Sequence, residues 1–240
     1  LKSVLFSPED IDLVKGTPQF KRQFLDVSMM QVDPSYIETL NVYKKILKQR
    51  NALLKKIGKE QDLTFLNILS EQLSEHGKTI IEKREQFLNT LNHEFTSIYQ
   101  TFNNAKVYVS YKPNVEAHKI LHAMMKNKDT DIILKTTTTG PQRDDIQVMY
   151  NGAEAKEKAS QGQQRLIAIA MKLAVLEHIK KITGKPVVLL LDDVLSELDQ
   201  EKQKLILSYQ QENQQTIINS AIPKDITSGT AILLEGEHHE

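Results

Sequence analysis

The sequence predicts an α/β protein whose sheet-bearing part is interrupted by a long helical arm. Residues 187–191 form an unbroken apolar run of strand length, which is typical of a parallel strand buried on both faces. Apolar residues recur at helical spacing just before it, along residues 166–176. Between residues 36 and 102 apolar positions repeat every seven residues, the pattern of two packed helices. Together these patterns predict a helix-covered sheet with a helical insertion.

A helix start and two long helices are expected in the first hundred residues. Ser7 suits the N-cap of a helix, because a proline and two acidic residues follow it in the first turn. The seams of residues 36–57 and 62–102 pass through Leu40, Leu47 and Leu54 and through Leu66, Leu73, Ile80 and Phe87. Consecutive helices with such seams should pack as an antiparallel arm.

Shorter elements return the chain to the sheet-bearing part. Residues 106–111 alternate as a strand does, and residues 115–128 have the pattern of a helix. A second short strand at 146–150 runs into the tight turn Asn151-Gly152, which predicts a hairpin. The last predicted strand covers residues 216–219.

Composition excludes several classes of protein. The 240 residues are 40% hydrophobic and 26% charged, as in an ordinary soluble globular protein. No apolar run approaches the roughly 20 residues of a membrane helix, and no signal peptide is visible. The absence of cysteine rules out disulfides, thiolate metal sites and cysteine nucleophiles. The 31 basic and 31 acidic residues cancel, so a nucleic acid would need a local basic patch.

Asp192 and Asp193 follow the predicted strand 187–191 directly, at the sheet edge where α/β proteins bind ligands. Two adjacent carboxylates are costly there unless a cation or a titrating partner is near. On one interpretation, Asp192 holds Mg²⁺ through water, and Asp193 orients or deprotonates an attacking water. On the other, the pair is a solvated turn. The pair alone leaves both open.

The run Ser160-Gln161-Gly162-Gln163-Gln164 opens the helix that precedes this strand. Ser160 suits the N-cap position. A helix N-terminus with a small cap, a glycine and free N–H groups favours an anion, because that end carries about half a positive charge. Taken by itself, the run is better explained as an ordinary capped helix.

Together, residues 159–199 resemble the signature motif, Walker B strand and D-loop of ABC-type ATPases. The run Asp-Asp-Val-Leu-Ser-Glu-Leu-Asp at 192–199 lacks the Glu-Pro-Thr of transporter ATPases and is similar to the RecF family. The likeness covers about residues 1–222. It implies a partial ABC/SMC-type P-loop ATPase head with an inserted helical arm, or lid. Residues 1–26 would belong to the head, 27–130 to the arm and 131–240 to the C-terminal lobe of the head.

The resemblance also implies roles for single residues. Asp192 would bind Mg²⁺, and Asp193 stands where related enzymes carry a catalytic acid. ATP contacts are implied for the signature and D-loop residues Ser160, Gln161, Gly162, Gln163, Gln164, Ser196, Leu198 and Asp199.

The whole-protein function that the resemblance implies is recombinational DNA repair. Intact members of the family are weak ATPases of the cytoplasm, in which ATP closes a homodimer of heads on DNA. The family loads recombinase at single-strand gaps with RecO and RecR, in replication restart and the SOS response. The implied partners are therefore DNA, as single strands and single-strand/duplex junctions, RecO, RecR and a second copy.

Basic side chains on the helix at 36–57 are the best candidates for contact with the DNA backbone. They are Lys44, Lys45, Lys48, Arg50, Lys55 and Lys56. A solvent-facing lysine side of an amphipathic helix is the commoner explanation of such a set, and it stays open.

No P-loop of the form G-x-x-x-x-G-K-[ST] occurs in the 240 residues. Gly77-Lys78-Thr79 matches its end, but Gln72 stands where the first glycine is needed, and the run lies inside a heptad pattern. We interpret it as coincidental. Because the likeness corresponds to the C-terminal two-thirds of the family, the chain is expected to be a truncated form that is inactive alone.

Two other functions stay open. The first is a non-enzymatic scaffold that binds DNA or RecR, which the missing P-loop favours. The second is another SMC-like or transporter-type ATPase, against which Asp193 and the short arm argue. The sequence also departs from the family pattern: Gln23 replaces a basic residue, Gln142 a histidine, and Lys158-Ala159 a Phe-Gly pair.

Overall fold

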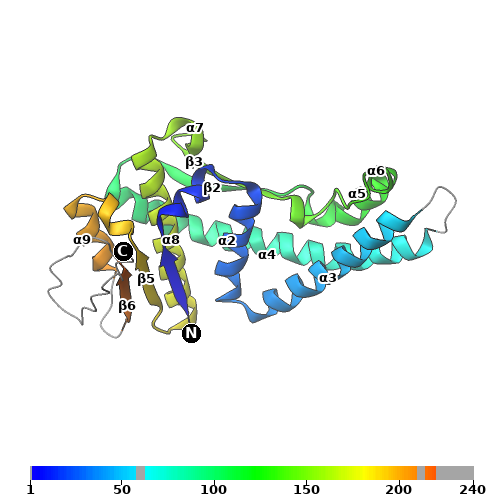
Figure 1. Ribbon diagram of the computed structural model, residues 1–240, viewed down its shortest axis with the longest axis horizontal. Helices are drawn as coiled ribbons and strands as arrows, with labels where there is room; N and C mark the ends of the chain where they lie inside the picture. The colour runs from blue at the N-terminus through cyan, green and yellow to red at the C-terminus, as the bar shows by residue number, and fades with distance from the viewer. Residues whose placement is uncertain (1, 58–62, 210–213, 220–240) are drawn as a thin grey trace, which may run out of the picture.

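The computed structural model describes residues 2–57, 63–209 and 214–219 of the 240. Figure 1 shows a head that holds a parallel sheet and an arm of long helices that projects from it. The predicted α/β class with an inserted helical arm is therefore confirmed. None of the helices in these ranges is long and apolar enough to cross a bilayer.

The head is built on a three-stranded parallel sheet in the order β1-β5-β6. β5 (Val188–Asp192) lies between β1 (Ser3–Phe6) and β6 (Thr216–Asn219). The two strands predicted at 187–191 and 216–219 are confirmed, the first shifted by one residue. The sequence-based prediction lacks β1, because four residues of mixed polarity are too short a pattern to identify a strand.

α8 (Gln161–Thr183) packs against β1 and against η1 (Pro8–Ile11). The Lys172 ammonium lies in this contact, where it pairs with the Asp10 carboxylate and donates to the Leu5 carbonyl oxygen at 2.5 Å. Both side chains are buried. The ion pair therefore fastens the middle of α8 to the start of the chain.

The arm consists of α3 (Pro34–Lys56) and α4 (Thr64–Phe102), which lie side by side (Figure 1). α1 (Asp12–Lys15) and α2 (Pro18–Met30) lead into it. Most of the predicted seam is buried, including Leu40, Leu54, Leu66, Leu73 and Ile80. The antiparallel pair of long helices is thus confirmed.

Gly77 lies in the middle of α4 rather than in a phosphate-binding loop. A Cβ atom at this position would come within 2.6 Å of Cδ1 of Ile120. The glycine therefore permits close packing of α5 (Ile120–Lys126) on the arm. This confirms that Gly77-Lys78-Thr79 is a coincidental match to a P-loop.

A second sheet is antiparallel, in the order β2-β3-β4, and packs against α4 and α2. Its strands are β2 (Val107–Lys112), β3 (Asp145–Tyr150) and β4 (Ala153–Glu154). Asn151 and Gly152 join the last two with φ of 48° and 85°. Positive φ at both central residues is what a tight hairpin turn requires, so the predicted hairpin is confirmed.

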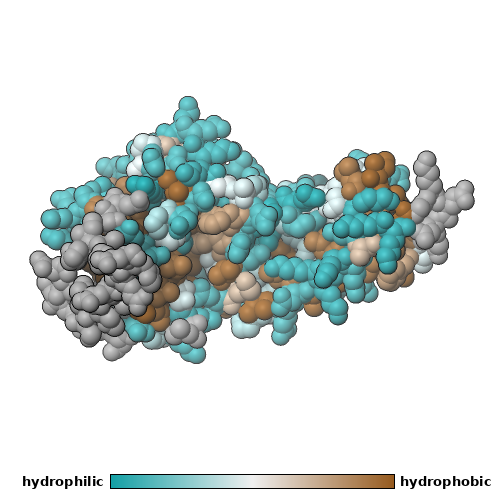
Figure 2. Space-filling model, in the orientation of Figure 1, coloured by the Kyte–Doolittle hydropathy of each residue, from teal (hydrophilic) through white to brown (hydrophobic). Residues whose placement is uncertain are grey.

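The single helix predicted at 115–128 is wrong in extent. The structure has η2 (Ala117–Lys119), α5 and then α6 (Lys128–Leu134), with a break at Asn127. The Asn127 side chain donates to the Thr139 hydroxyl at 2.9 Å, which holds the break against the returning chain. Figure 2 shows hydrophobic residues over α6, where Ile133 is 77% exposed. The remaining elements are η3 (Pro141–Arg143), α7 (Ala155–Lys158), η4 (Val194–Glu197) and α9 (Gln200–Ser208).

A buried network joins the arm to the head. Arg84 of α4 contacts Asp26 of α2 at 2.8 Å and Asp144 of the turn before β3 at 3.0 Å. The Tyr36 hydroxyl of α3 donates to the same Asp26 carboxylate at 2.5 Å. α2 runs without a break through residue 26, where the sequence places a domain boundary. The division at residues 26 and 130 stays a prediction.

Candidate nucleotide and nucleic-acid sites

The N-terminus of α8 is closed by a capping box. The Ser160 hydroxyl accepts from the Gln163 amide at 3.3 Å, and the Gln163 side chain accepts from the Ser160 amide at 2.8 Å. Gly162 is open: within the described residues, no group outside its own helix turn lies within 4 Å of where its Cβ would be. The Ser160 cap is therefore confirmed, and the adjacent backbone is accessible to a ligand.

Gln164 has a different role from its neighbours. Its side chain is buried, and its amide nitrogen lies 2.9 Å from the carbonyl oxygen of Ala159 and within 3.4 Å of the carbonyl oxygens of Ala155 and Lys156. It thus holds α7 and the approach to α8 in place. The prediction that Gln164 contacts ATP is wrong for its side chain, which faces the protein interior.

The predicted D-loop forms η4 and the cap of α9. Asp199 caps α9 by accepting from the Lys202 amide at 3.0 Å, and its carboxylate also pairs with the Lys202 ammonium. The side-chain amide of Gln203 donates to the carbonyl oxygens of Leu195 and Leu198, at 2.6 and 2.8 Å. The loop backbone is therefore fixed. Ser196 belongs to η4, but its side chain lies outside the described part of the structure.

One open hollow of about 350 Å³ brings the two motifs together. Ser160, Gly162 and Gln163 line it from α8, and Leu198 and Asp199 line it from the D-loop. Sequence reasoning missed five further residues of its wall, which are Phe102, Asn103, Arg165, Leu166 and Lys202. Two of these are cations, so the hollow combines an open glycine, a helix N-terminus and positive side chains. Gln161 is exposed beside it.

The acid pair lies at the C-terminal edge of β5, as predicted. Asp192 is exposed, and its carboxylate accepts from the Asn219 side chain of β6 at 2.8 Å. Asp193 follows in the left-handed region, with φ of 49°, and its amide donates to the Asn219 carbonyl at 2.9 Å. Neither aspartate lines the 350 Å³ hollow.

The donor set at Asp192 fits one kind of metal site. In the described residues no group of three or more His, Cys, Asp or Glu side chains could hold a metal ion. Mg²⁺ is commonly held by one or two carboxylates, waters and substrate phosphates, so it needs no such group. An exposed Asp192 at a sheet edge is compatible with that arrangement.

The five lysines of the predicted DNA face are all exposed on α3. They are Lys44, Lys45, Lys48, Lys55 and Lys56, and in the described structure none of them makes an ion pair. We call them the lysine face. Figure 2 shows hydrophilic residues along much of the arm. The face is therefore free to meet an anionic partner.

Arg50 does not belong to this face, and its predicted DNA contact is wrong. Its side chain is fully buried and pairs with Asp131 at 2.7 Å. It also donates to the hydroxyls of Thr137 at 2.8 Å and Ser70 at 3.0 Å. Arg50 therefore tethers the segment after α6 to the two arm helices.

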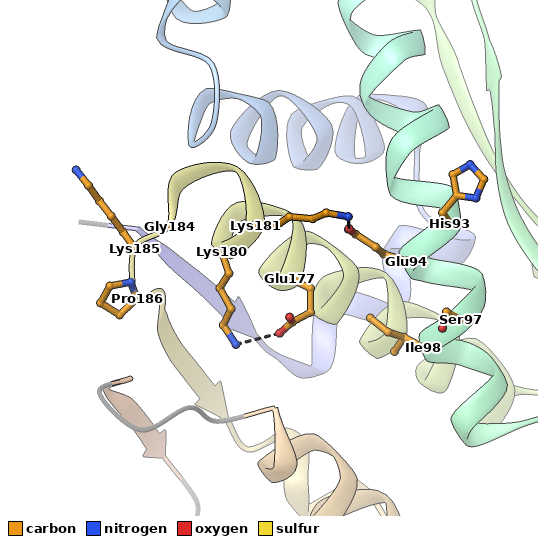
Figure 3. A pocket seen from close by; sticks show the side chains of 10 residues that line it. All are labelled: His93, Glu94, Ser97, Ile98, Glu177, Lys180, Lys181, Gly184, Lys185 and Pro186. Carbon is orange, nitrogen blue, oxygen red and sulfur yellow. Dashed lines mark hydrogen bonds and ion pairs between the residues drawn. The ribbon is translucent and has the colours of Figure 1, made fainter.

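A larger hollow, of about 890 Å³, lies between α4 and the C-terminal end of α8 (Figure 3). No predicted site residue lines it. Its two carboxylates are already compensated: Glu177 pairs with Lys180 at 2.9 Å, and Glu94 pairs with Lys181 at 3.4 Å. Lys185 also lines the hollow and makes no ion pair in the described structure, so the carboxylates are compensated while one cation of the wall is not.

His178 of α8, whose ring packs edge-on against Phe87, should make the stability of the protein depend on pH. Burial lowers its pKa below 6.5, and the Glu94 carboxylate, 3.7 Å from Nδ1, opposes the shift only in part. The unfolded chain therefore binds the proton first, so stability is lost as pH falls through 6.5. The His178→Phe variant, which keeps an aromatic ring beside Phe87, should lose less stability than wild type between pH 7.5 and 5.5 in urea unfolding. Equal losses would contradict the assignment.

No family model matches the sequence. It is 46% identical over 239 residues to the DNA replication and repair protein RecF of Acholeplasma laidlawii, which covers 99% of this chain and 68% of the relative. RecF of Streptococcus agalactiae serotype V is 41% identical over 226 residues, covering 90% of this chain and 61% of the relative.

The same similarity is seen in three dimensions. A solved structure of the recombination mediator protein RecF with ATPrS in the RecFOR pathway superposes with a TM-score of 0.86 at 32% identity. It covers 94% of this chain and 63% of the other. The RecF-ATP structure gives the same TM-score at 33% identity. The chain thus spans about two thirds of the length of the proteins that it matches.

Proposed function

Because this chain belongs to the RecF family, we propose that it acts in recombinational DNA repair and replication restart, as the DNA-binding and signature-bearing part of an ATP-dependent head. Relatives at 41% and 46% identity carry the name DNA replication and repair protein. The further proposal is that ATP closes a homodimer of such heads on DNA and that the dimer loads recombinase at single-strand gaps with RecO and RecR.

The hollow between the signature and the D-loop is the proposed nucleotide contact. In this proposal Ser160, Gly162 and Gln163 bind the terminal phosphate of an ATP held by another head. Support comes from the open glycine, the N-terminus of α8 and the cations of the wall. Mg²⁺ would supply charge neutralisation of the phosphates, and Asp192 would hold it. Asp193 would accept a proton from, or orient, the attacking water.

Mg-ATP titrated into this chain alone should give no tight binding, because the 240 residues contain no phosphate-cradling loop. Isothermal calorimetry measures this, with Asp192→Ala as the control. Tight binding that the Asp192→Ala variant loses would show a phosphate cradle within the chain. That result would overturn the proposal that the hollow serves a nucleotide of another head, and it would bring Gly77-Lys78-Thr79 back into consideration.

The lysine face carries the DNA-binding part of the proposal. Five exposed lysines lie on the side of α3 opposite its buried seam. Unpaired surface cations release condensed counterions when they contact phosphates, and this release drives binding to a nucleic acid. A protein with zero formal net charge has no global attraction for DNA, so the local face has to supply it.

Reversing three charges of this face, Lys44→Glu, Lys45→Glu and Lys48→Glu together, should weaken DNA binding at least about tenfold. The plot of log affinity against log salt should also become shallower, by about 0.9 for each lost contact to duplex DNA. Fluorescence anisotropy with a labelled duplex and a labelled single strand measures both.

The matched control reverses three exposed lysines scattered over the head, Lys15→Glu, Lys106→Glu and Lys185→Glu, so the net charge changes equally. The control should bind close to wild-type strength. Equal losses in both triple variants would mean that net charge alone attracts DNA. Unchanged affinity and salt dependence in the lysine-face variant would exclude this face as the DNA site.

A further inference from the structure

A separate pocket of about 450 Å³ opens where α2 crosses the arm, and its wall comes from α2, α3, α4 and the turn at Pro141–Gln142. In Figure 1, α2 stands across the arm helices at this junction. None of the predicted nucleotide-site residues lines it. Its size suits a small organic ligand.

Two cations in this pocket make no direct ion pair in the described structure. For Arg22, burial lowers the pKa, and the nearby carboxylates of Asp144, Asp145 and Asp26 oppose that shift. Arg22 donates to the carbonyl oxygen of Asp144 at 2.5 Å but makes no ion pair in the described structure. Lys44 is exposed at the wall and is likewise without an ion pair there. The third cation, Arg84, is already paired with Asp26, the one carboxylate of the wall. Among the lining side chains, Arg22 and Lys44 are therefore the two cations that a phosphate could contact without breaking an ion pair of the described structure.

Beside these cations lies an apolar surface. Val27, Met30, Leu40, Leu47 and Ile80 contribute to the wall, and Val27 is 48% exposed. Gln23 adds an exposed amide that makes no hydrogen bond within the described residues. An apolar wall, a polar amide and two cations outside any ion pair of the described structure match a flat heterocycle joined to a phosphate. The combination is that of a nucleotide, not of a bare anion.

The pocket continues the lysine face. Lys44 belongs to both, and Lys48 lies one helical turn further along α3 on the same side. A strand that follows the lysine face towards the head would therefore pass the mouth of the pocket. A base paired in a duplex cannot enter without breaking its pair, whereas an unpaired base can turn in at little cost.

We propose that this pocket takes one unpaired nucleotide of a DNA strand that lies on the lysine face. Its phosphate contacts Arg22 and Lys44, and its base packs on Val27 and Leu47. The Arg84–Asp26 pair of the wall, with Tyr36 bonded to it, holds the pocket in shape without a ligand. The inference rests on the proposed DNA-binding function and adds to it a preference for single strands.

The test compares a labelled twelve-nucleotide oligothymidylate with a duplex of equal length, by anisotropy, on the full 240-residue chain. Arg22→Gln should weaken binding of the single strand about tenfold and of the duplex less than about twofold. Its salt slope for the single strand should fall by about 0.7. The matched control is Arg143→Gln, because Arg143 is exposed and also donates to a backbone carbonyl, that of Thr137 at 3.5 Å.

The contact with the base is tested separately. Val27→Ser should weaken the binding of oligothymidylate severalfold. It should leave unchanged the binding of an abasic strand of the same length. Val42→Ser is the control, because Val42 is 39% exposed on α3 and does not line the pocket. Thermal melting of each variant confirms that the fold is kept.

The possible outcomes distinguish a failure of the pocket proposal from a failure of the proposed DNA-binding function. If the lysine-face variant weakens both DNAs while Arg22→Gln and Val27→Ser change neither, the pocket proposal fails and the DNA-binding face stands. If the lysine-face variant changes neither DNA, the proposed function fails at this face. If free thymidine monophosphate competes as well as the strand, molecule for molecule, the pocket is a mononucleotide site and the strand proposal is overturned.

Discussion

Replacing Arg84 with methionine should destabilise the protein by about 3 to 5 kcal/mol, because it strips the cation from a buried network. The Arg84 side chain is 3% exposed, and the Asp144 side chain that it contacts is fully buried. Asp26, its other partner, is 11% exposed at the side chain. Both carboxylates would be left in a low-dielectric environment without the charge that compensates them. Urea unfolding followed by circular dichroism measures the loss.

Two further variants show whether the loss is electrostatic. Arg84→Lys keeps the positive charge but not the forked geometry of the guanidinium group. Its free energy of unfolding should therefore lie between those of wild type and Arg84→Met. Adding Asp144→Asn to Arg84→Met removes one of the two uncompensated carboxylates and should recover part of the stability. A cost below about 1 kcal/mol for Arg84→Met would show that the network does not hold the arm to the head.

Arg50→Met should cost a similar amount, about 3 to 5 kcal/mol, at the other end of the arm. Both members of the Arg50–Asp131 pair are 0% exposed. Asp131 also accepts from the Thr138 amide at 2.8 Å, so its carboxylate is fixed in place when the cation is removed. The segment after α6 should then loosen, which hydrogen exchange at residues 131–138 would report.

The matched control for this pair is the double variant Arg50→Met with Asp131→Asn. It removes both charges and should be more stable than Arg50→Met alone. DNA affinity should stay within about twofold of wild type in both variants if they remain folded, since a buried arginine cannot reach a phosphate. A large loss of DNA affinity in a folded Arg50→Met variant would restore Arg50 to the DNA-binding face.

The elements predicted best are those whose apolar pattern is long. β5 and α8 each contain enough apolar residues, at the spacing of a strand or of a helix, to identify the element. The heptad seams of α3 and α4 predict the helical arm. The break at Asn127 escaped prediction because its cause is a hydrogen bond to Thr139, which only the folded chain brings near.

Arg50 and Gln164 show what the sequence hides at the candidate sites. Arg50 has the same seven-residue spacing as Tyr36, Tyr43 and Ile57, a signal that it faces inward. Its partner Asp131 lies 81 residues away in sequence, so only the tertiary structure identifies the pair. Gln164 belongs to a motif whose cap was predicted correctly. Its side-chain amide faces inward because it donates to backbone carbonyl oxygens of residues 155–159, whose position is known only from the folded structure.

The most direct test of the account is to locate bound DNA on the lysine face. The chain contains no cysteine, so Lys48→Cys gives a single attachment point for an azidophenacyl photocrosslinker. Efficient crosslinking to DNA is expected from position 48, lost at high salt, and little is expected from Lys106→Cys on the head. Equal crosslinking from both positions, or crosslinking from position 106 alone, would contradict it.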